Sequence, residues 1–409
     1  MTEYQSDLLH LLEARGHIHQ LTDAAALDAL AQRETVTGYV GFDPTAPSLH
    51  IGNLASIMLL KRLQQAGHRP IVIMGGGTAK IGDPSGKDDV RKLLTDDLLK
   101  ANIASIHDSF AKILRFDDSE TGALLINNDE WLSELGYIEF LRDVGQHFTI
   151  NRMLTFDSVR LRLDREQPLT FLEFNYMILQ AYDFLKLSRE YGCRLQLGGS
   201  DQWGNIVNGI ELGRRIDGSE LYGVTAPLIT TADGKKMGKS VTGAVWLNED
   251  QLPVYDFWQY WRNTDDRDVG RFLRLFTDVP LEEIARLETL AGAEINEAKK
   301  LLANEVTAMC RGERAAADAA VTAERTFEQG AVGEGLPTMA IPSGEIGLLD
   351  AMVELGLVAS KGEAKRLVKG GGARIDGEQV GDVSAMVSVG ETPVRISAGK
   401  KKHGVLIRD

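Results

Sequence analysis

Three residues at the start of an expected helix have the types and spacing that could bind a nucleotide. His50, Gly52 and Asn53 lie in PTAPSLHIGNL, where an apolar strand gives way to a turn and then a helix. Gly costs a helix interior about 1 kcal/mol relative to Ala, so helix stability does not explain Gly52. A helix N-terminus attracts phosphate through its free N–H groups and dipole, and a missing side chain would let a base or ribose approach the backbone. The segment therefore predicts a nucleotide site, although a lone histidine there could also be a cap or solvated.

The segment lies within an alternation of strands and helices that is typical of an open α/β sheet. Strands are expected at 36–42 and 70–74, and the helix from about 49 to 65 between them carries its apolar residues on one face. Ser48 is a suitable N-cap for that helix and Gly67 a suitable stop. Three strand ends combine Gly with Asp, in GFDPT, GGGTAKIGDPSGK and GGSDQWGN. Such ends line the ligand crevice of a parallel sheet, so a nucleotide-binding α/β domain is predicted.

Two common nucleotide fingerprints do not fit. GGGTAKIG departs from G-x-G-x-x-G because Lys80 stands where the third Gly belongs, and no acidic residue follows at the spacing of a dinucleotide unit. GKKMGKS has three residues between its glycines where a phosphate loop has four. These mismatches argue against NAD binding and against Walker-type phosphate chemistry.

A polar stripe interrupts an otherwise apolar helix expected over 170–187, which we predict to be buried. Tyr176, Gln180 and Asp183 are spaced i, i+4 and i+7, so they share one face. A satisfied structural network is one explanation of such a stripe. Because Tyr39 and Asp83 are expected at nearby strand ends, a pocket for a small zwitterion is the preferred interpretation.

The lysine-rich segment TTADGKKMGKSVTG, 230–243, has no periodicity and could be a solvated surface loop. It follows PLIT, which is expected to be a strand that arrives at the same crevice. A flexible cationic loop can close over a triphosphate and bring Lys236 and Lys239 to the charge that develops in phosphoryl chemistry. We therefore interpret it as part of the site.

Charge and cysteine content indicate where a polyanion could bind and argue against a disulfide framework or a zinc site. The chain of 409 residues has a net charge of −14, but residues 361–409 contain ten Lys and Arg against six Asp and Glu. A polyanion would therefore meet this last segment first. Cys193 and Cys310 lack the spacing of a disulfide framework or a zinc site. An acidic amphipathic start and the absence of long apolar runs predict a cytoplasmic location without membrane spans.

Six motifs resemble class I aminoacyl-tRNA synthetases. PTAPSLHIGNL is similar to the first class signature and KMGKS, 236–240, to the second, with Gly238 where Ser is more usual. YVGFDPTA, GGGTAKIGDPSGK, EFNYMILQAYDF and LQLGGSDQWGNI resemble the bacterial tyrosyl-tRNA synthetases in order and approximate spacing. Asn53 replaces the second His of the first signature, a variation that the class accommodates. The resemblance covers essentially the whole chain.

The resemblance implies a reaction and its site residues. L-Tyrosine and ATP would give tyrosyl-adenylate and pyrophosphate, and tRNA(Tyr) would then accept the tyrosyl group, with Mg²⁺ on the triphosphate and no prosthetic group. The residues implied in catalysis are Thr45, His50, Lys236 and Lys239. The residues implied in tyrosine binding are Asp83, Tyr176 and Gln180 at the ammonium, Tyr39 and Asp183 at the phenol hydroxyl, and Gln196. Those implied in ATP binding are Asp43, Gly52, Asn53, Gly199, Asp201, Gln202 and Lys239.

The resemblance also implies a division of the chain. A Rossmann-like parallel-sheet catalytic domain is expected over 1–247, an α-helical anticodon-side domain over 248–325, a linker over 326–344, and a small α+β RNA-binding domain of the S-four ribosomal type over 345–409. A generic α+β appendage is the alternative for the last domain. An insertion within about 90–190 forms the dimer interface in relatives, so a homodimer is expected. The tRNA contacts are expected from basic residues of the last domain, namely Lys361, Lys365, Arg366, Lys369, Lys400, Lys401 and Lys402.

Two other functions remain open. A tryptophanyl-tRNA synthetase shares the class I core, but the phenol-directed pair Tyr39 and Asp183 and the basic last segment argue against it. An RNA-binding protein with an inactive synthetase core is the second alternative. The presence of His50, Asp83 and both signature lysines argues against it.

Overall fold

A computed structural model describes residues 4–83, 94–234, 237–240, 243–327, 336–342, 344–390, 392–399 and 402–408. The chain forms two compact units, Met1–Leu252 with Thr264–Ala298, and Pro253–Asn263 with Lys299–Asp409. The expected helical domain 248–325 is thus shared between both units, so the expected domain boundaries stay a prediction. Within the described ranges, none of the helices combines the length and hydropathy that crossing a membrane requires.

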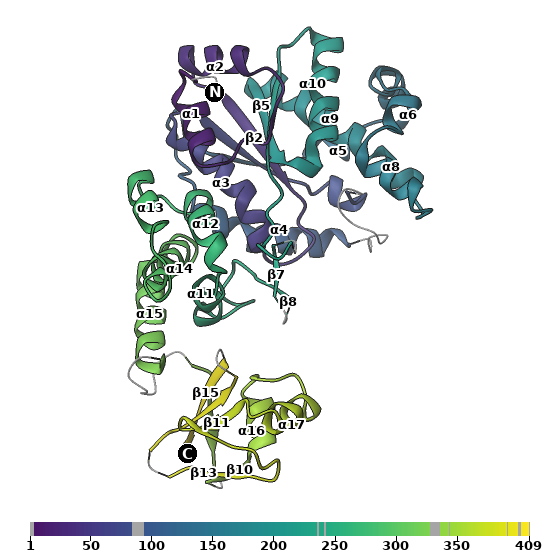
Figure 1. Ribbon diagram of the computed structural model, residues 1–409. Coiled ribbons are helices and arrows are strands. Elements are labelled where there is room, and N and C mark those ends of the chain that lie inside the picture. Colours follow the sequence, from purple (N-terminus) through teal and green to yellow (C-terminus); the bar gives the residue numbers. More distant parts are fainter. Residues whose placement is uncertain are drawn as a thin grey trace. The chain divides into compact units, whose positions relative to one another are not determined.

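A six-stranded sheet forms the centre of the first unit, in the order β1-β6-β5-β2-β3-β4 (Figure 1). Its strands are β1 (Gln20–Leu21), β2 (Thr37–Phe42), β3 (Arg69–Met74), β4 (Leu124–Asn127), β5 (Cys193–Gly199) and β6 (Tyr222–Ala226). The predicted parallel sheet is confirmed for five strands, whereas β1 pairs antiparallel with β6 at the edge. The expected strand PLIT is wrong: β6 ends at Ala226, because Pro227 has no N–H to continue the ladder.

Helices cover both faces of this sheet. The main ones are α3 (Ile51–Gln65), α9 (Phe171–Tyr191) and α10 (Trp203–Asp217). Neighbouring residues of a strand point to opposite faces: a Cβ on Gly38 would lie 3.0 Å from Leu63 of α3, whereas the Tyr39 ring lies 5.3 Å from that of Phe184 of α9. Tyr39 therefore points to the face that α9 covers.

Further elements complete the first unit. The helices are α1 (Asp7–Ala14), α2 (Ala24–Arg33), α4 (Asp96–Ala111), α5 (Asp129–Leu132), α6 (Tyr137–Asp143), α7 (Ile150–Met153), α8 (Asp157–Asp164), α12 (Val269–Phe276) and α13 (Leu281–Leu287). The 3-10 helices are η1 (Thr78–Lys80), η2 (Gly145–His147), η3 (Ser200–Gln202) and η4 (Asp266–Asp268), and β7 (Lys239–Ser240) pairs with β8 (Gly243–Ala244).

Two expectations about helix ends are wrong. The N-cap of α3 is His50 rather than Ser48, because the Ser48 hydroxyl donates to Leu49 O and accepts from the Asn248 N–H. The helix predicted to be buried over 170–187 starts at the surface, where Phe171 is 69% and Leu172 42% exposed. Apolar composition alone cannot distinguish a core from a surface that another molecule covers.

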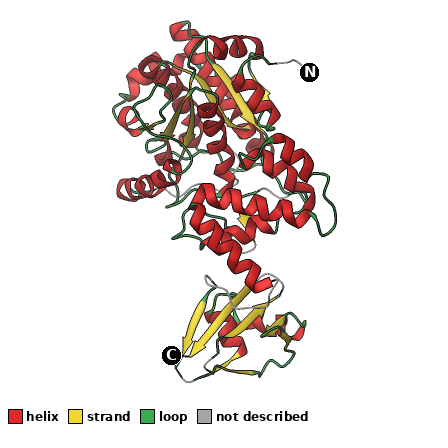
Figure 2. Ribbon diagram, turned by 90° about the vertical axis from the view of Figure 1, so that its left-hand side faces the viewer, coloured by secondary structure: helices red, strands yellow, loops and turns green. Residues whose placement is uncertain are grey.

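The second unit contains helices followed by a small α+β domain (Figure 2). Its helices are α11 (Val254–Arg262), α14 (Ile295–Arg311, which begins in the first unit), α15 (Glu313–Phe327), α16 (Leu348–Glu354) and α17 (Lys361–Lys369). Its strands are β9 (Thr338–Ile341), β10 (Glu345–Gly347), β11 (Ala373–Ile375), β12 (Glu378–Gln379), β13 (Met386–Ser388), β14 (Val394–Ala398) and β15 (Lys402–Arg408).

The strands of the small domain correct the expected linker. They form a five-stranded sheet in the order β12-β11-β14-β15-β9 and a two-stranded sheet of β10 and β13. β9 lies within the expected linker 326–344 yet pairs in parallel with β15. Prolines and glycines flank β9 in the sequence, and its partner residues lie 67 positions away (Thr338 with Val405), so local composition did not reveal the strand.

Candidate active site

A cavity of about 510 Å³ opens at the carboxyl ends of the parallel strands, beside the start of α3. This volume is within the range of small-molecule sites. The cavity brings together every predicted tyrosine and ATP residue whose side chain the structure describes: Tyr39, Asp43, Thr45, His50, Gly52, Asn53, Asp83, Tyr176, Gln180, Asp183, Gln196, Gly199, Asp201 and Gln202. The crevice predicted from the three strand ends is therefore present.

The Tyr39 hydroxyl and the Asp183 carboxylate are among the most buried polar groups of the cavity. Tyr39 is 1% and Asp183 3% exposed. Within the described residues, the Tyr39 hydroxyl has no hydrogen-bond partner. Burial raises the pKa of Asp183 to about 7, against the two hydrogen bonds that it accepts. Burial, and then the Asp183 charge, raises the pKa of Tyr39 well above its usual value, so Tyr39 remains a neutral hydroxyl that can donate to or accept from a ligand.

Two residues that the sequence did not reveal orient Asp183. Asn128 Nδ2 donates to Asp183 at 2.9 Å, and Trp131 Nε1 donates to it at 2.8 Å. Both follow the carboxyl end of β4, the strand LLIN that was not predicted. Asn128 and Trp131 could have been predicted from the sequence if the strand LLIN had been recognised. Residues that follow the carboxyl end of a parallel strand line the crevice.

Asp43 connects β2 with α9 and η1. Its carboxylate accepts from Tyr176 Oη at 3.1 Å and from Thr78 Oγ1 at 2.9 Å. Thr78 was quoted within GGGTAKIG but not predicted as a site residue. These two donors orient the Asp43 carboxylate, whose charge acts on the nearby Asp183.

Amide side chains form a further part of the cavity wall. Gln202 Nε2 donates to Asp83 at 3.0 Å, Gln180 Nε2 donates to Gln202 Oε1 at 3.3 Å, and Asn205 Nδ2 donates to Gln180 Oε1 at 2.9 Å. Asn205 was also missed by sequence reasoning, although it lies in the quoted motif. Gln196 is 2% exposed, and no partner for its Oε1 is present among the described residues. The wall therefore combines a fixed network with a buried acceptor that a ligand donor could satisfy.

The start of α3 forms the outer end of the cavity. Asn53 Oδ1 accepts from the His50 N–H at 3.1 Å, which ties down the first turn. A Cβ on Gly52 would lie 2.8 Å from the His50 ring and 3.3 Å from Met237 O. The missing side chain thus makes room first for His50 and the following loop, a reason that the sequence analysis did not consider.

The signature loop, residues 230–243, is joined by its backbone to this helix start. Val245 N donates to Gly238 O at 3.1 Å, and Ile51 N donates to Val245 O at 2.9 Å. Gly238 has a φ of +126°, a conformation that L side chains rarely adopt, which explains Gly at the position where the class more often has Ser. Lys236 lies outside the described residues, and Lys239 is described only as backbone of β7.

The predicted tRNA-binding residues lie in the small domain. Lys361, Lys365, Arg366 and Lys369 are all exposed on α17. Lys402 Nζ donates to Leu357 O at 3.1 Å. Lys400 and Lys401 lie outside the described residues. α17 therefore carries four exposed cations, of which Lys361 forms an ion pair with Asp350, and exposed cations are what a polyanion-binding surface requires.

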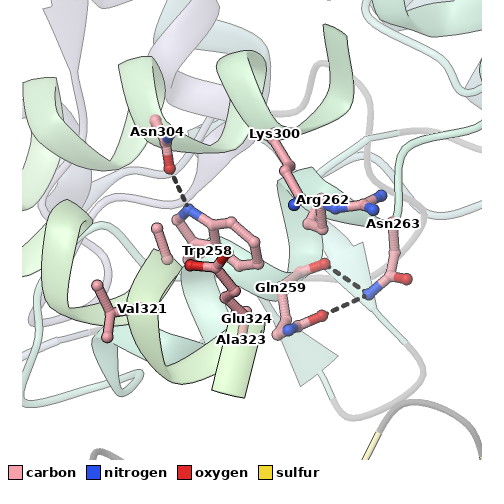
Figure 3. A pocket seen from close by; sticks show the side chains of 10 residues that line it. Trp258, Gln259, Arg262, Asn263, Lys300, Asn304, Val321, Ala323 and Glu324 are labelled. Carbon is pink, nitrogen blue, oxygen red and sulfur yellow. Dashed lines mark hydrogen bonds between the residues drawn. The ribbon is translucent and has the colours of Figure 1, made fainter. Parts of the chain in front are cut away.

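A second cavity, of about 380 Å³, lies among α11, α14 and α15 (Figure 3). Trp258 Nε1 donates to Asn304 Oδ1 at 2.8 Å in its wall, and Asn263 donates to Gln259. None of the predicted site residues lines it. It belongs to the second unit and is separate from the strand-end cavity.

Comparisons with known proteins agree with this geometry. Residues 31–328 match the family of class I tRNA synthetases (W and Y), and residues 326–405 match the C-terminal domain of SYY-like tyrosine–tRNA ligases. The chain is 66% identical to a tyrosine–tRNA ligase of Novosphingobium aromaticivorans and 64% identical to one of Zymomonas mobilis, in each case over 99% of both chains. A truncated mitochondrial tyrosyl-tRNA synthetase of Aspergillus nidulans superposes with a TM-score of 0.71 at 30% identity, covering 79% of this chain and 95% of that one.

Proposed function

This chain belongs to the class I tyrosyl-tRNA synthetases, and from that premise we propose how its crevice carries out the reaction of a tyrosine–tRNA ligase. The carboxylate of L-tyrosine attacks the α-phosphorus of ATP, which forms tyrosyl-adenylate as pyrophosphate leaves. A hydroxyl of the 3′-terminal adenosine of tRNA(Tyr) then attacks the acyl carbon, and AMP leaves. Neither step needs a covalent enzyme nucleophile, so the protein contributes positioning and electrostatics.

The buried end of the cavity is proposed to bind the tyrosine side chain. The hydrogen-bonding state of Tyr39 and Asp183 carries this proposal. The Tyr39 hydroxyl lacks a partner within the described residues, and the Asp183 carboxylate beside it is held by two donors. A phenol hydroxyl could bond to the Tyr39 hydroxyl and give Asp183 a third donor, whereas phenylalanine would leave the Tyr39 hydroxyl unpaired. Tyrosyl-tRNA synthetases are themselves the standard example of this form of discrimination.

The remaining walls are proposed to bind the polar ends of the substrates. Asp83, Tyr176 and Gln180 would hold the tyrosine ammonium, with Gln196 and Asp43 nearby. The adenosine would lie against the residues at the ends of β5 and the start of α3, namely Gly52, Asn53, Gly199, Asp201 and Gln202.

The outer phosphates are proposed to meet cationic and hydroxyl groups as charge develops on them. Thr45 and His50 line the outer part of the cavity, and Lys236 and Lys239 belong to the loop beside it. Mg²⁺ would arrive with the triphosphate and neutralise part of its charge. In this arrangement the stabilisation is largest when pyrophosphate departs.

ATP–pyrophosphate exchange with each of the twenty amino acids tests the proposed activation step. We expect exchange with tyrosine and only traces with phenylalanine and tryptophan. Exchange driven equally by tryptophan would contradict the role of Tyr39 and Asp183, and no exchange with any amino acid would contradict the activity itself.

A homodimer is proposed from the surface of the segment that was expected to form one. Most of the large hydrophobic side chains exposed on the described surface fall between 137 and 172: Tyr137, Ile138, Leu141, Ile150, Leu154, Leu161, Leu163, Phe171 and Leu172. An exposed apolar surface of this kind is typical of an interface, and a second copy can cover it by two-fold symmetry. Sedimentation equilibrium should show a dimer for the protein, a monomer for Phe171→Glu and a dimer for the control Val321→Glu; a monomeric wild-type protein would refute the dimer.

The exposed cations of α17 are proposed to contact tRNA phosphates. A cytoplasmic location stays a prediction from the sequence.

A further inference from the structure

Two side chains that lie after the signature loop in the sequence, Asp268 and Arg271, hold its first residues in place. Ala232 N donates to Asp268 Oδ2 at 2.6 Å, and Arg271 Nη2 donates to Thr230 O. Arg271 Nη2 also donates to Asp268 Oδ1 at 2.6 Å. One carboxylate and one guanidinium therefore bind the N–H and the C=O of the loop entry while they bind each other.

The carboxylate of this pair is buried in the first unit, whereas the Arg271 side chain is 41% exposed. Asp268 is 4% exposed at the end of η4, directly before α12, and its two oxygens are both used in these bonds. The Arg271 guanidinium lies 5.0 Å from the centre of the Phe272 ring. A buried carboxylate that lost either partner would be costly, so the bonds restrain the loop entry more strongly than surface contacts would.

Backbone hydrogen bonds hold the other end of the signature loop. Leu247 N donates to Leu49 O at 2.7 Å and Ile51 N donates to Val245 O at 2.9 Å, so the loop exit is fixed to the start of α3. Helix α12, which carries Arg271, contacts α3 directly. Entry and exit are therefore anchored to two helices that pack on one another, and the distance between the anchors cannot vary freely.

We propose that Asp268 and Arg271 are positioning residues for adenylate formation, acting by fixing the place from which the signature loop starts. The inference rests on the proposed function, because it assumes that this loop acts on the phosphates of ATP. Neither side chain lines the strand-end cavity, so neither is expected to bind substrate. A misplaced catalytic group costs rate in the chemical step and leaves binding at a separate subsite unchanged.

The test compares Asp268→Ala, Arg271→Ala and the double variant with the wild-type protein. Arg274→Ala is the matched control, since Arg274 lies on the same helix but pairs with Glu288 at 2.6 Å, away from the loop. Rapid-quench measurement gives the rate constant of tyrosyl-adenylate formation at saturating tyrosine and ATP. Equilibrium dialysis gives the dissociation constant of tyrosine, and circular dichroism checks folding at the assay temperature.

We expect each single variant to slow adenylate formation by about tenfold, with the dissociation constant of tyrosine unchanged and the control at the wild-type rate. The double variant should be no slower than the worse single one, because the two groups act as a unit. Wild-type rates in Asp268→Ala, multiplicative losses in the double variant, or a parallel loss of tyrosine binding would each overturn the inference. If the wild-type protein itself formed no adenylate, the proposed function would fail instead.

Discussion

Replacing Asp183 by Asn should change how the free energy of unfolding depends on pH. The burial of the Asp183 carboxyl sets the direction of this change. Asp183 is buried, and its pKa is raised from 3.8 to about 7, chiefly by burial. A folded state that binds a proton more tightly than the unfolded state loses stability as pH rises between the two pKa values. The stability that protonated Asp183 contributes to the folded state is therefore fully present below about pH 4. It declines between pH 4 and about 7 and is lost above that.

The size of the effect follows from the width of that window. The shift from 3.8 to about 7 is about three units, which corresponds to about 4 kcal/mol at 25 °C. Asn carries no charge, but its amide nitrogen would face one of the two donors, Asn128 or Trp131, at a cost of about 1–3 kcal/mol. We therefore expect Asp183→Asn to be more stable than the wild-type protein by roughly 1–3 kcal/mol at pH 8, and less stable by a similar amount at pH 4.

Urea unfolding followed by circular dichroism, at one protein concentration and at pH 4, 6 and 8, measures this difference. Asp217→Asn is a control with the opposite sign, because hydrogen bonds from Arg189 lower the pKa of Asp217. That control should lose stability at pH 8 and approach the wild-type protein at low pH. A variant Asp183→Asn that is less stable than the wild-type protein at every pH would refute the reasoning, since the sign change is its direct consequence.

Replacing Asp183 by Ala, which removes the acceptor altogether, reports on selectivity. A hydrogen bond to a charged acceptor contributes about 1.5–3 kcal/mol, so its loss should reduce the preference for tyrosine over phenylalanine in pyrophosphate exchange by roughly 10- to 150-fold. An unchanged preference in the folded variant would remove Asp183 from the phenol site.

Three further predictions concern other parts of the chain. Lys239→Ala should slow adenylate formation on the order of 10²-fold with tyrosine binding intact, as measured by rapid quench and dialysis; a wild-type rate would mean a solvated loop. Gly52→Ala should raise the KM for ATP in exchange assays, because the new Cβ would lie 2.8 Å from His50; an unchanged KM and kcat would contradict the tight packing. A chain ending after Phe327 should still form adenylate but lose most tRNA charging, and charging by the full chain should fall with salt; full charging by the shortened chain would remove the small domain from tRNA binding.

The sequence predicted elements whose signal is local. The helix 51–65 has an apolar face of helical period, and the strands 37–42 and 69–74 are short runs of mostly buried residues. The strand-end rule then located the crevice. The polar stripe Tyr176, Gln180 and Asp183 was identified because helical spacing is independent of the rest of the fold.

Features defined by distant partners were missed. β1 has two residues and exists through pairing with β6, and β9 exists through pairing with β15. Asn128 and Trp131 become site residues only because α9 brings Asp183 against them. No local pattern encodes such contacts, since they depend on which elements the chain packs together.

The order of strands in the small domain affects how this chain can fold while it is being synthesised. β15 lies between β14 and β9 in the sheet, although β9 precedes every other strand of that sheet in the chain. As the chain leaves the ribosome, β9 has no neighbour to pair with until β15 has been made. The catalytic unit, whose parallel strands come first, can fold earlier. In a nascent chain the amino-acid-activating unit is therefore expected to fold before the RNA-binding domain. Until β15 is made, the backbone edge of β9 is unpaired and can pair with strands other than β15.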